Sequence, residues 1–190
     1  MNFLAHLHIA QHCQSSLLGN LLGDFVKGNP HEQYDDDIAQ GIKLHRFVDS
    51  FTDSHSFVQE SRALFTDGHR RFSGIALDMF WDHCLARHWQ NYHSDSLENF
   101  CQYAQQQVNQ PKISLPARFE RVNALIWQGK WLESYQDMDN IEFALQRMSQ
   151  RSPRMEKLNQ CIPYLNRHYD ELTEVFARFY PEVLNASKRF

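Results

Sequence analysis

Apolar residues recur at the three- and four-residue spacing of an amphipathic helix along most of this chain of 190 residues. One run shows the spacing clearly, with Leu17, Leu18, Leu21, Leu22 and Phe25. No stretch alternates apolar and polar residues as a strand does, and no Asn-Gly pair marks a hairpin. Glycine (7) and proline (6) are scarce, which disfavours a turn-rich β sandwich. The sequence therefore predicts an all-α fold with about eight to ten helices.

Breaks in this spacing predict where the helices of the first half begin and end. Ser15 or Ser16 can cap the second helix, and Lys27-Gly28-Asn29-Pro30 should end it. We expect one domain over residues 1–190, in which residues 1–110 carry the functional site and residues 111–190 complete the core. The expected helices of the first half cover residues 2–12, 17 to about 27, 34–37 to about 65 with a break near 54–56, 75–89 and 97–108, with a loop over 66–71.

Composition and charge exclude several classes of protein. The chain is 42% hydrophobic and has 14 phenylalanines, so it can bury a core. Its formal net charge of -4 argues against a general nucleic-acid binder. The first residues, MNFLAHLHIAQHC, lack the basic segment of a signal peptide, and no apolar run is long enough to cross a membrane. We therefore expect a cytoplasmic protein with neither a nucleic-acid nor a membrane partner.

Carboxylates and imidazoles interrupt three of the expected apolar helices. His45 and Asp49 are four residues apart and share a helix face, as do Asp78 and Asp82. Buried carboxylates are costly unless they are paired, hydrogen-bonded or bound to a metal ion. Carboxylates that converge with histidine suit Mn²⁺, Mg²⁺ or Fe²⁺ better than structural zinc. The pattern predicts a divalent metal site that activates water for attack on phosphorus, and its candidate residues are Asp24, His45, Asp49, Asp78, Asp82 and His83.

Each of these groups alone also has an ordinary structural interpretation. A carboxylate and a histidine at i and i+4 usually form an exposed, salt-bridged helix face. Asp24 can simply end its helix, and Asp53 can cap a turn. His6 and His8 point apart on a helix, so at most one of them can join a site. Three such groups in one small domain are harder to attribute to chance.

Basic residues flank the acidic stretches. Arg70 and Arg71 lie directly before the helix that carries Asp78, within the segment GHRRFSG. Solvated loop arginines are the simpler interpretation, whereas a functional role would suit a phosphate or an acidic protein. The candidates for binding a substrate or partner are Lys43, Arg46, Arg62, Arg70 and Arg71.

Four longer phrases carry a resemblance to a known family. Taken together and in this order, they resemble the acyl carrier protein phosphodiesterase family: MNFLAHLHIA, GNLLGDFVKG, LHRFVDSFTDSH and RRFSGIALDMFWDHCLARHW. They cover the first half of the chain densely, and the second half is compatible but less distinctive.

The resemblance implies a Mn²⁺-dependent enzyme of lipid metabolism with a helical bundle related to the HD phosphohydrolases. Such an enzyme hydrolyses the phosphodiester between 4′-phosphopantetheine and the serine of holo-acyl carrier protein, giving the apo carrier and free 4′-phosphopantetheine. The resemblance assigns metal ligation and catalysis to the six candidates above, with Asp82-His83 similar to the HD doublet. Acyl carrier proteins are strongly acidic helical bundles, so the five basic candidates would steer the carrier to the site.

Two other functions use the same residues differently. An HD-type phosphohydrolase of nucleotides or other small phosphodiesters would share the metal site and need no protein partner. A non-catalytic helical module that binds an acidic protein would use the acidic pairs as caps and salt bridges. An activity assay with the holo carrier and with small diesters distinguishes these functions, because the non-catalytic module would turn over neither substrate.

Overall fold

The structure is a computed structural model and describes residues 1–66 and 68–190. Every regular element within these ranges is a helix, which confirms the predicted all-α fold. The described residues form eleven α-helices and four 3-10 helices, rather than the expected total of about eight to ten. Sharp turns divide the second half more finely than expected, for example at Lys130, whose φ of 48° separates α7 from α8.

The α-helices are α1 (Phe3–His12), α2 (Leu17–Leu22), α3 (Asp36–Ser54), α4 (Ser56–Ala63), α5 (Ser73–Arg87), α6 (Leu97–Asn109), α7 (Ala117–Gln128), α8 (Trp131–Ser134), α9 (Met138–Ser149), α10 (Ile162–Arg167) and α11 (Tyr169–Ser187). The 3-10 helices are η1 (Pro30–Glu32), η2 (Arg70–Phe72), η3 (Trp89–Asn91) and η4 (Pro153–Cys161).

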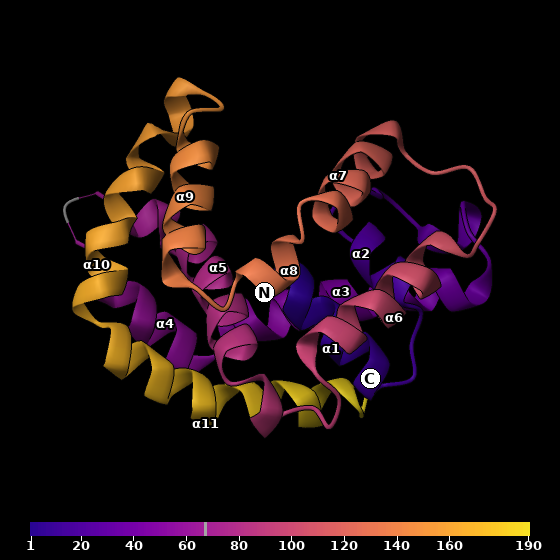
Figure 1. Cartoon of the computed structure of the whole chain (residues 1–190), viewed down its shortest axis with the longest axis horizontal. Coiled ribbons are helices and arrows are strands. Elements are labelled where there is room, and N and C mark those ends of the chain that lie inside the picture. Colours follow the sequence, from indigo (N-terminus) through magenta and orange to yellow (C-terminus); the bar gives the residue numbers. More distant parts are fainter. Residues whose placement is uncertain (67) are drawn as a thin grey trace.

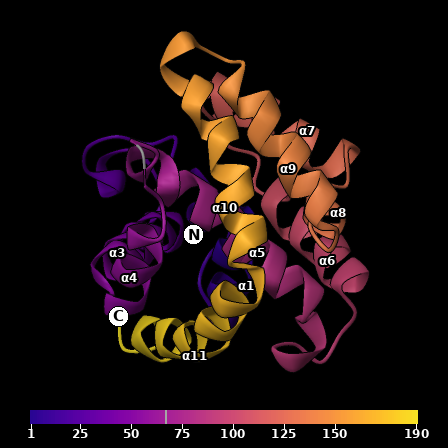
Figure 2. The same cartoon turned by 90° about the vertical axis from the view of Figure 1, so that its left-hand side faces the viewer.

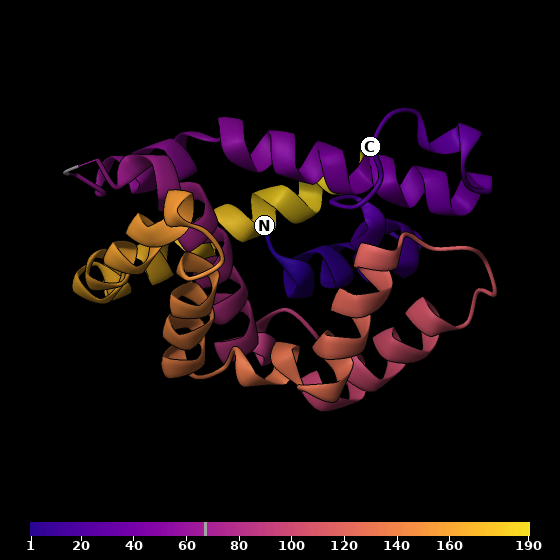
Figure 3. The same cartoon turned by 90° about the horizontal axis from the view of Figure 1, so that it is seen from above.

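The helices rise in two groups from a common base. In Figure 1, α9 and α10 stand on one side and α7 on the other, with α8 and the N-terminus between them and α11 along the base. Figure 2 shows α3 and α4 on the opposite side of α10 from α6–α9. Seen from above, the N-terminus lies near the middle of the molecule (Figure 3). The first helix is therefore central, and its residues from Leu4 to Ala10 are all buried.

Aromatic side chains from α5 and α11 join the base to the centre. Trp81 of α5 is fully buried and stacks on Phe176 of α11, with ring centroids 6.0 Å apart. Phe176 in turn stacks on Tyr180, at 4.9 Å. Large aromatic rings bury the most apolar area of any side chain, so this stack anchors α11 to α5. Among the described residues, no helix is both long enough and apolar enough to span a bilayer.

Helix α2 begins as predicted and ends earlier. Ser16 is its cap, since its hydroxyl accepts a hydrogen bond from the Gly19 amide. The helix stops at Leu22 instead of near Lys27, and residues 23–25 form a turn. Glycines also bring α2 against α3: a Cβ added at Gly19 would lie 2.9 Å from the Cα of Gly41. The end of α2 is thereby held beside the middle of α3.

The predicted break between residues 54 and 56 is confirmed. His55 separates α3 from α4 with an extended backbone (φ −69°, ψ 136°), and its Nδ1 accepts a hydrogen bond from the Phe57 amide. Within the predicted loop over residues 66–71, Asp67 lies outside the described residues. The end of that loop forms η2, from which α5 starts two residues earlier than predicted.

Candidate active site

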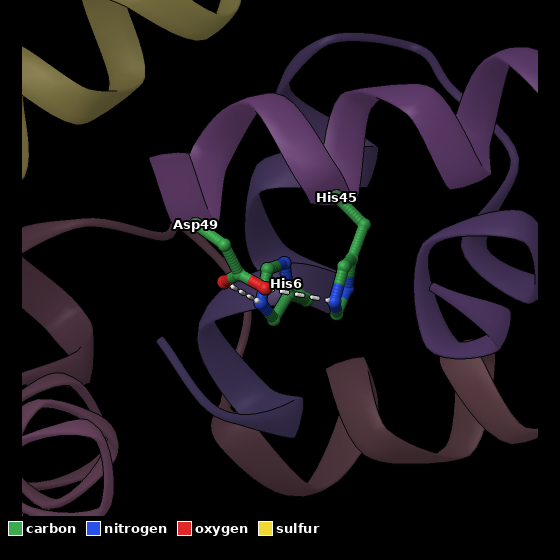
Figure 4. A group of neighbouring side chains, drawn as sticks. All are labelled: His6, His45 and Asp49. Carbon is green, nitrogen blue, oxygen red and sulfur yellow. Dashed lines mark hydrogen bonds and ion pairs between the residues drawn. The ribbon is translucent and has the colours of Figure 1, made fainter. Parts of the chain in front are cut away.

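Two histidines and one aspartate meet at the centre of the molecule. His6 comes from α1, and His45 and Asp49 come from successive turns of α3 (Figure 4). The Nε2 atom of His6 lies 3.1 Å from Oδ1 of Asp49, and that of His45 lies 3.1 Å from Oδ2 of the same carboxylate. One potential ligand atom from each residue lies within 4.8 Å of the others. Such a group of two imidazoles and a carboxylate can hold a divalent metal ion.

Close packing fixes the two imidazole rings. They stack with centroids 3.8 Å apart and an interplanar angle of 19°. Both rings are almost fully buried, and their Nδ1 atoms have no hydrogen-bond partner among the described residues. The Nε2 atoms thus make the only polar contacts found for these rings, and both contact carboxylates. A cation bound between the rings and Asp49 would replace these contacts with coordination bonds.

Gly23 makes room for His45. A Cβ added at Gly23 would overlap Cγ and Cδ2 of the His45 ring and would lie 2.7 Å from the His45 Cβ. Gly23 itself has ordinary right-handed helical angles (φ −50°, ψ −41°), so its backbone does not require glycine. The position requires glycine for space alone, since the imidazole packs directly on the backbone of the turn.

The three groups differ in charge. Burial opposes a charge on His45, but the carboxylates of Asp24 and Asp49 outweigh it and raise the pKa of this imidazole to about 9. Burial and the nearby charge of His45 lower the pKa of His6 to about 4. Burial also opposes ionisation of Asp49, yet hydrogen bonds from His45 and His6 hold the pKa of this carboxyl well below its usual range. Near pH 7, His45 is therefore cationic, His6 neutral and Asp49 anionic.

Two further candidate carboxylates lie at the edge of the group. Asp24 follows the turn after α2, and its Oδ1 lies 3.5 Å from Nε2 of His45. Asp78 of α5 faces the group from another side, and its Oδ1 lies 2.8 Å from the α-amino nitrogen of Met1. That nitrogen is also 3.7 Å from Oδ1 of Asp49. The side chains of Asp24 and Asp78 are 59% and 40% exposed, so both can contact a ligand from solvent.

Asp82 lies one turn deeper on α5 and contacts the start of α1. Its two carboxylate oxygens accept hydrogen bonds from the amides of Leu4 and Ala5, at 2.7 and 3.0 Å. Asn2, at the cap position of α1, makes no such side-chain bond. Burial raises the pKa of Asp82 to about 7, against these two hydrogen bonds. Asp82 thus caps α1 from a different helix, and metal ligation by Asp82 stays a prediction.

Asp82→Ala should lower the free energy of unfolding by about 3 kcal/mol, because two buried amides of α1 lose their acceptor. Urea unfolding of the metal-free protein measures this loss. Arg87→Ala is the matched control on the same helix, and we expect a change of about 0.5 kcal/mol or less because its side chain is exposed and forms no ion pair with a described residue. If the Asp82→Ala protein is as stable as the wild type but no longer binds metal, Asp82 is a metal ligand instead of a helix cap.

His83 points away from the central group. Its Nδ1 lies 2.8 Å from the carbonyl oxygen of Tyr135, and its Nε2 lies 2.7 Å from the hydroxyl of Tyr169. Because a carbonyl can only accept, Nδ1 carries the proton and Tyr169 donates to Nε2. His83 lines a separate polar pocket of about 490 Å³ with Arg87 and Asp137. Adjacent residues of a helix point about 100° apart, which is why Asp82 and His83 do not converge.

His6 is the member of the group that the sequence pattern did not single out. It has no acidic partner four residues away in its own helix, since its partner Asp49 comes from α3. The only signal was a histidine inside an apolar helix, and His8 gave the same signal. His8 instead lies 2.7 Å from the Tyr180 hydroxyl and 3.2 Å from the Tyr92 carbonyl oxygen.

The basic candidates separate into two sets. Arg46 donates to the carbonyl oxygens of Val26 and Gly28, and so holds the loop after α2. Lys43 lies one turn before Arg46 on α3. Arg62, Arg70 and Arg71 lie at the other end of the site, around the start of α5.

Comparison with known proteins gives one consistent result. The profile of a family described as "Acyl carrier protein phosphodiesterase" matches residues 1–183. A Salmonella agona protein named acyl carrier protein phosphodiesterase is 45% identical over 190 residues, which cover 100% of this chain and 98% of that protein. Proteins of the same name from Yersinia pestis and Pectobacterium atrosepticum are 44% and 43% identical over 189 residues, or 99% of this chain and 98% of each relative. No solved structure matches the chain, so the resemblance to an HD fold stays a prediction.

Proposed function

The chain belongs to the acyl carrier protein phosphodiesterase family, and from this premise we propose that it releases 4′-phosphopantetheine from holo-acyl carrier protein at the His6–His45–Asp49 group. The reaction hydrolyses the phosphodiester to the carrier's serine and leaves the apo carrier. The family match over nearly the whole chain carries this proposal, and the buried group of metal-ligand type supports it. The proposed setting is the cytoplasm, without a nucleic-acid or membrane partner.

The donor set fits a divalent cation. Two imidazole nitrogens and a carboxylate are a mixed nitrogen and oxygen set, without the thiolates that structural zinc prefers. We propose Mn²⁺ as the cofactor, with Mg²⁺ or Fe²⁺ as alternatives, held by His6, His45 and Asp49. Such a cation, when bound, polarises a phosphoryl oxygen and lowers the pKa of a coordinated water.

The carboxylates at the edge of the group complete the proposed site. Asp24 and Asp78 are partly exposed and flank the histidines from two sides. A carboxylate in hydrogen-bond reach of the attacking water can orient it and accept its proton. Asp24 is the stronger candidate for this role, because its carboxylate pairs with His45 alone among the described residues, whereas Asp78 is paired with the Met1 amine.

A mass measurement tests the proposal directly. Incubation with holo-acyl carrier protein and Mn²⁺ should remove the mass of 4′-phosphopantetheine from the carrier, and a chelator should prevent the loss. An unchanged carrier, in the presence of folded and metal-loaded protein, would contradict the proposed substrate. Turnover of nucleotides or small diesters in that same experiment would favour the small-phosphodiester alternative.

Binding of the cation should release about one proton near pH 7. His45 must be neutral to coordinate a metal ion, and its pKa of about 9 keeps it protonated in the metal-free protein. Calorimetric titrations with Mn²⁺ in buffers of different ionisation enthalpy count this proton. His31→Gln removes a surface histidine paired with Asp36 and should leave the count unchanged. Binding without proton release would remove His45 from the ligand set.

The stability of the metal-free fold and the increase in Tm caused by Mn²⁺ should follow pH in opposite directions. The raised pKa of His45 means that its ion pairs stabilise the metal-free fold fully below about pH 6.5, and this contribution is lost as the pH rises through about 9. The increase in Tm caused by Mn²⁺ should grow over the same window, because fewer protons compete for His45. Thermal unfolding at several pH values, with and without Mn²⁺, measures both trends.

A further inference from the structure

A row of basic side chains crosses the surface beside the start of α5. We define this basic ridge as Arg62, Arg70, Arg71, Arg154 and Lys157. They come from α4, η2 and η4, which are far apart in the sequence. We infer that the basic ridge is the docking surface for the acidic acyl carrier protein, an inference that rests on the proposed function.

Contacts between η2 and η4 bring the ridge together. Nε2 of His69, next to η2, lies 2.6 Å from Oε1 of Gln160 in η4. Residues three apart on a 3-10 helix share a face, so Arg154 and Lys157 lie on the same face as Gln160. The Nζ of Lys157 lies only 3.7 Å from the place where a side chain at Gly68 would begin. Lys157 therefore faces the loop that carries Arg70 and Arg71, and Arg154 lies one turn before it on the same face of η4.

The ridge is largely free of intramolecular partners. Arg70, Arg71, Arg154 and Lys157 are exposed, and none forms an ion pair with any described carboxylate. Glu156 is the acidic residue among the η4 cations, and it is exposed as well. Like charges placed side by side repel one another, so such a cluster is stabilised when an anionic surface binds it. The net charge of -4 for the whole chain makes this local excess more distinctive.

The ridge reaches the candidate active site through Arg62. Its Nη1 lies 3.5 Å from Oδ1 of Asp53, one helical turn beyond Asp49 on α3. Its Nη2 lies 3.6 Å from the place where a side chain at Gly74, in the first turn of α5, would begin. The scissile phosphodiester sits directly on the carrier's own serine, so the carrier surface must come close to the site during the reaction. A docking surface that begins about one helical turn from Asp49 meets this requirement.

An acidic protein fits the ridge better than a nucleic acid does. Five cations are enough to steer an acidic domain and to pair with its carboxylates. Strong binding of a duplex commonly needs about six to ten phosphate contacts, which an otherwise acidic surface does not offer. The basic ridge includes three of the five basic candidates predicted from the sequence, and it adds Arg154 and Lys157. Arg46 is not part of it, because Arg46 donates to carbonyl oxygens of the loop after α2.

Charge reversal at the far end of the ridge tests the inference. Arg154→Glu combined with Lys157→Glu should raise KM for the holo carrier by about tenfold at low salt and leave kcat within about twofold. The difference in KM should shrink at about 0.5 M salt, because exposed charges are screened. Bis(4-nitrophenyl) phosphate is a small diester that does not need a docking surface. If the wild type hydrolyses it, the double variant should hydrolyse it at the same rate. Neither residue contacts the His6–His45–Asp49 group.

The matched control reverses two exposed cations at the other end of the molecule. Lys188→Glu combined with Arg189→Glu makes the same change in net charge at the C-terminus, on the opposite side from α10 in Figure 1. This pair should leave KM for the carrier unchanged. Equal effects of the two double variants, or no effect of the ridge variant, would overturn the inference. If the ridge variant binds an oligonucleotide more weakly than the wild type does but has the same KM for the carrier, the basic ridge is a nucleic-acid site and the inference is wrong.

Binding measurements separate this inference from the proposed function. If the wild type does not release 4′-phosphopantetheine, the proposed function fails. Calorimetric binding of the holo carrier to the wild type and to the ridge variant then still decides whether the ridge docks it. If the wild type turns over the carrier and the ridge variant does so with the same KM, only the docking surface is wrong.

Discussion

Asp49→Asn should lower kcat/KM for the holo carrier by about a thousandfold or more and abolish the rise in Tm caused by Mn²⁺. Among the described carboxylates, Asp49 is the one that both imidazoles contact, each at 3.1 Å. An amide has the same shape but no charge, so it binds a divalent cation weakly and no longer balances the charge of His45. Kinetics with the holo carrier and thermal unfolding with Mn²⁺ measure the two effects.

The control for this variant is Asp53→Asn, one turn along the same helix. Its carboxylate is 72% exposed, and Arg62 is its only ion-pair partner in the described part of the chain. We expect kcat to stay within about twofold and the effect of Mn²⁺ on Tm to persist. An Asp49→Asn enzyme that keeps both turnover and its Mn²⁺ response would exclude His6–His45–Asp49 as the catalytic metal site.

Gly23→Ala should combine a loss of stability with a loss of activity. The new methyl group would overlap the His45 ring, because Gly23 packs directly on this ring at the end of α2. Overpacking of this kind costs about 1–3 kcal/mol. A displacement of His45 by about 1 Å would lower kcat/KM about a hundredfold. Urea unfolding and kinetics on the folded fraction measure the two losses separately.

Gly28→Ala is the matched control in the loop that follows. Gly28 has a positive φ of 78°, but no atom lies within 4 Å of an added Cβ. The change therefore costs only backbone strain, about 1 kcal/mol, and should leave kcat/KM nearly unchanged. If Gly23→Ala behaves like Gly28→Ala, the contact between Gly23 and His45 does not control the site.

Local pattern predicted the helices well, and tertiary contacts account for what it missed. Periodic apolar residues and the caps at Ser16 and His55 act within a few residues, so the starts of α2 and α4 follow from the sequence. The space that His45 needs explains why position 23 is a glycine, although His45 lies 22 positions away in the sequence. A periodicity argument cannot detect such a contact, because it considers one helix at a time.

The same distinction explains the candidate site. Spacing within α3 identified His45 and Asp49, whose partnership is local. Spacing also marked Asp82, but a carboxylate that caps a neighbouring helix and one that binds a metal ion have the same sequence pattern. His6 has no acidic residue at helical spacing in its own helix, since its partner Asp49 belongs to α3, so the sequence could not distinguish it from His8.

The bond between Asp82 and the start of α1 has a consequence for synthesis on the ribosome. The helix that carries His6 emerges first, yet its leading amides find their acceptors only 77 and 78 residues later in the chain. Until α5 has emerged, the first helix of the nascent polypeptide is an apolar segment whose leading amides lack their acceptor, a typical target for chaperones. We therefore expect the His6–His45–Asp49 group to take its final form only after α5 has emerged, although His6 is among the earliest residues made.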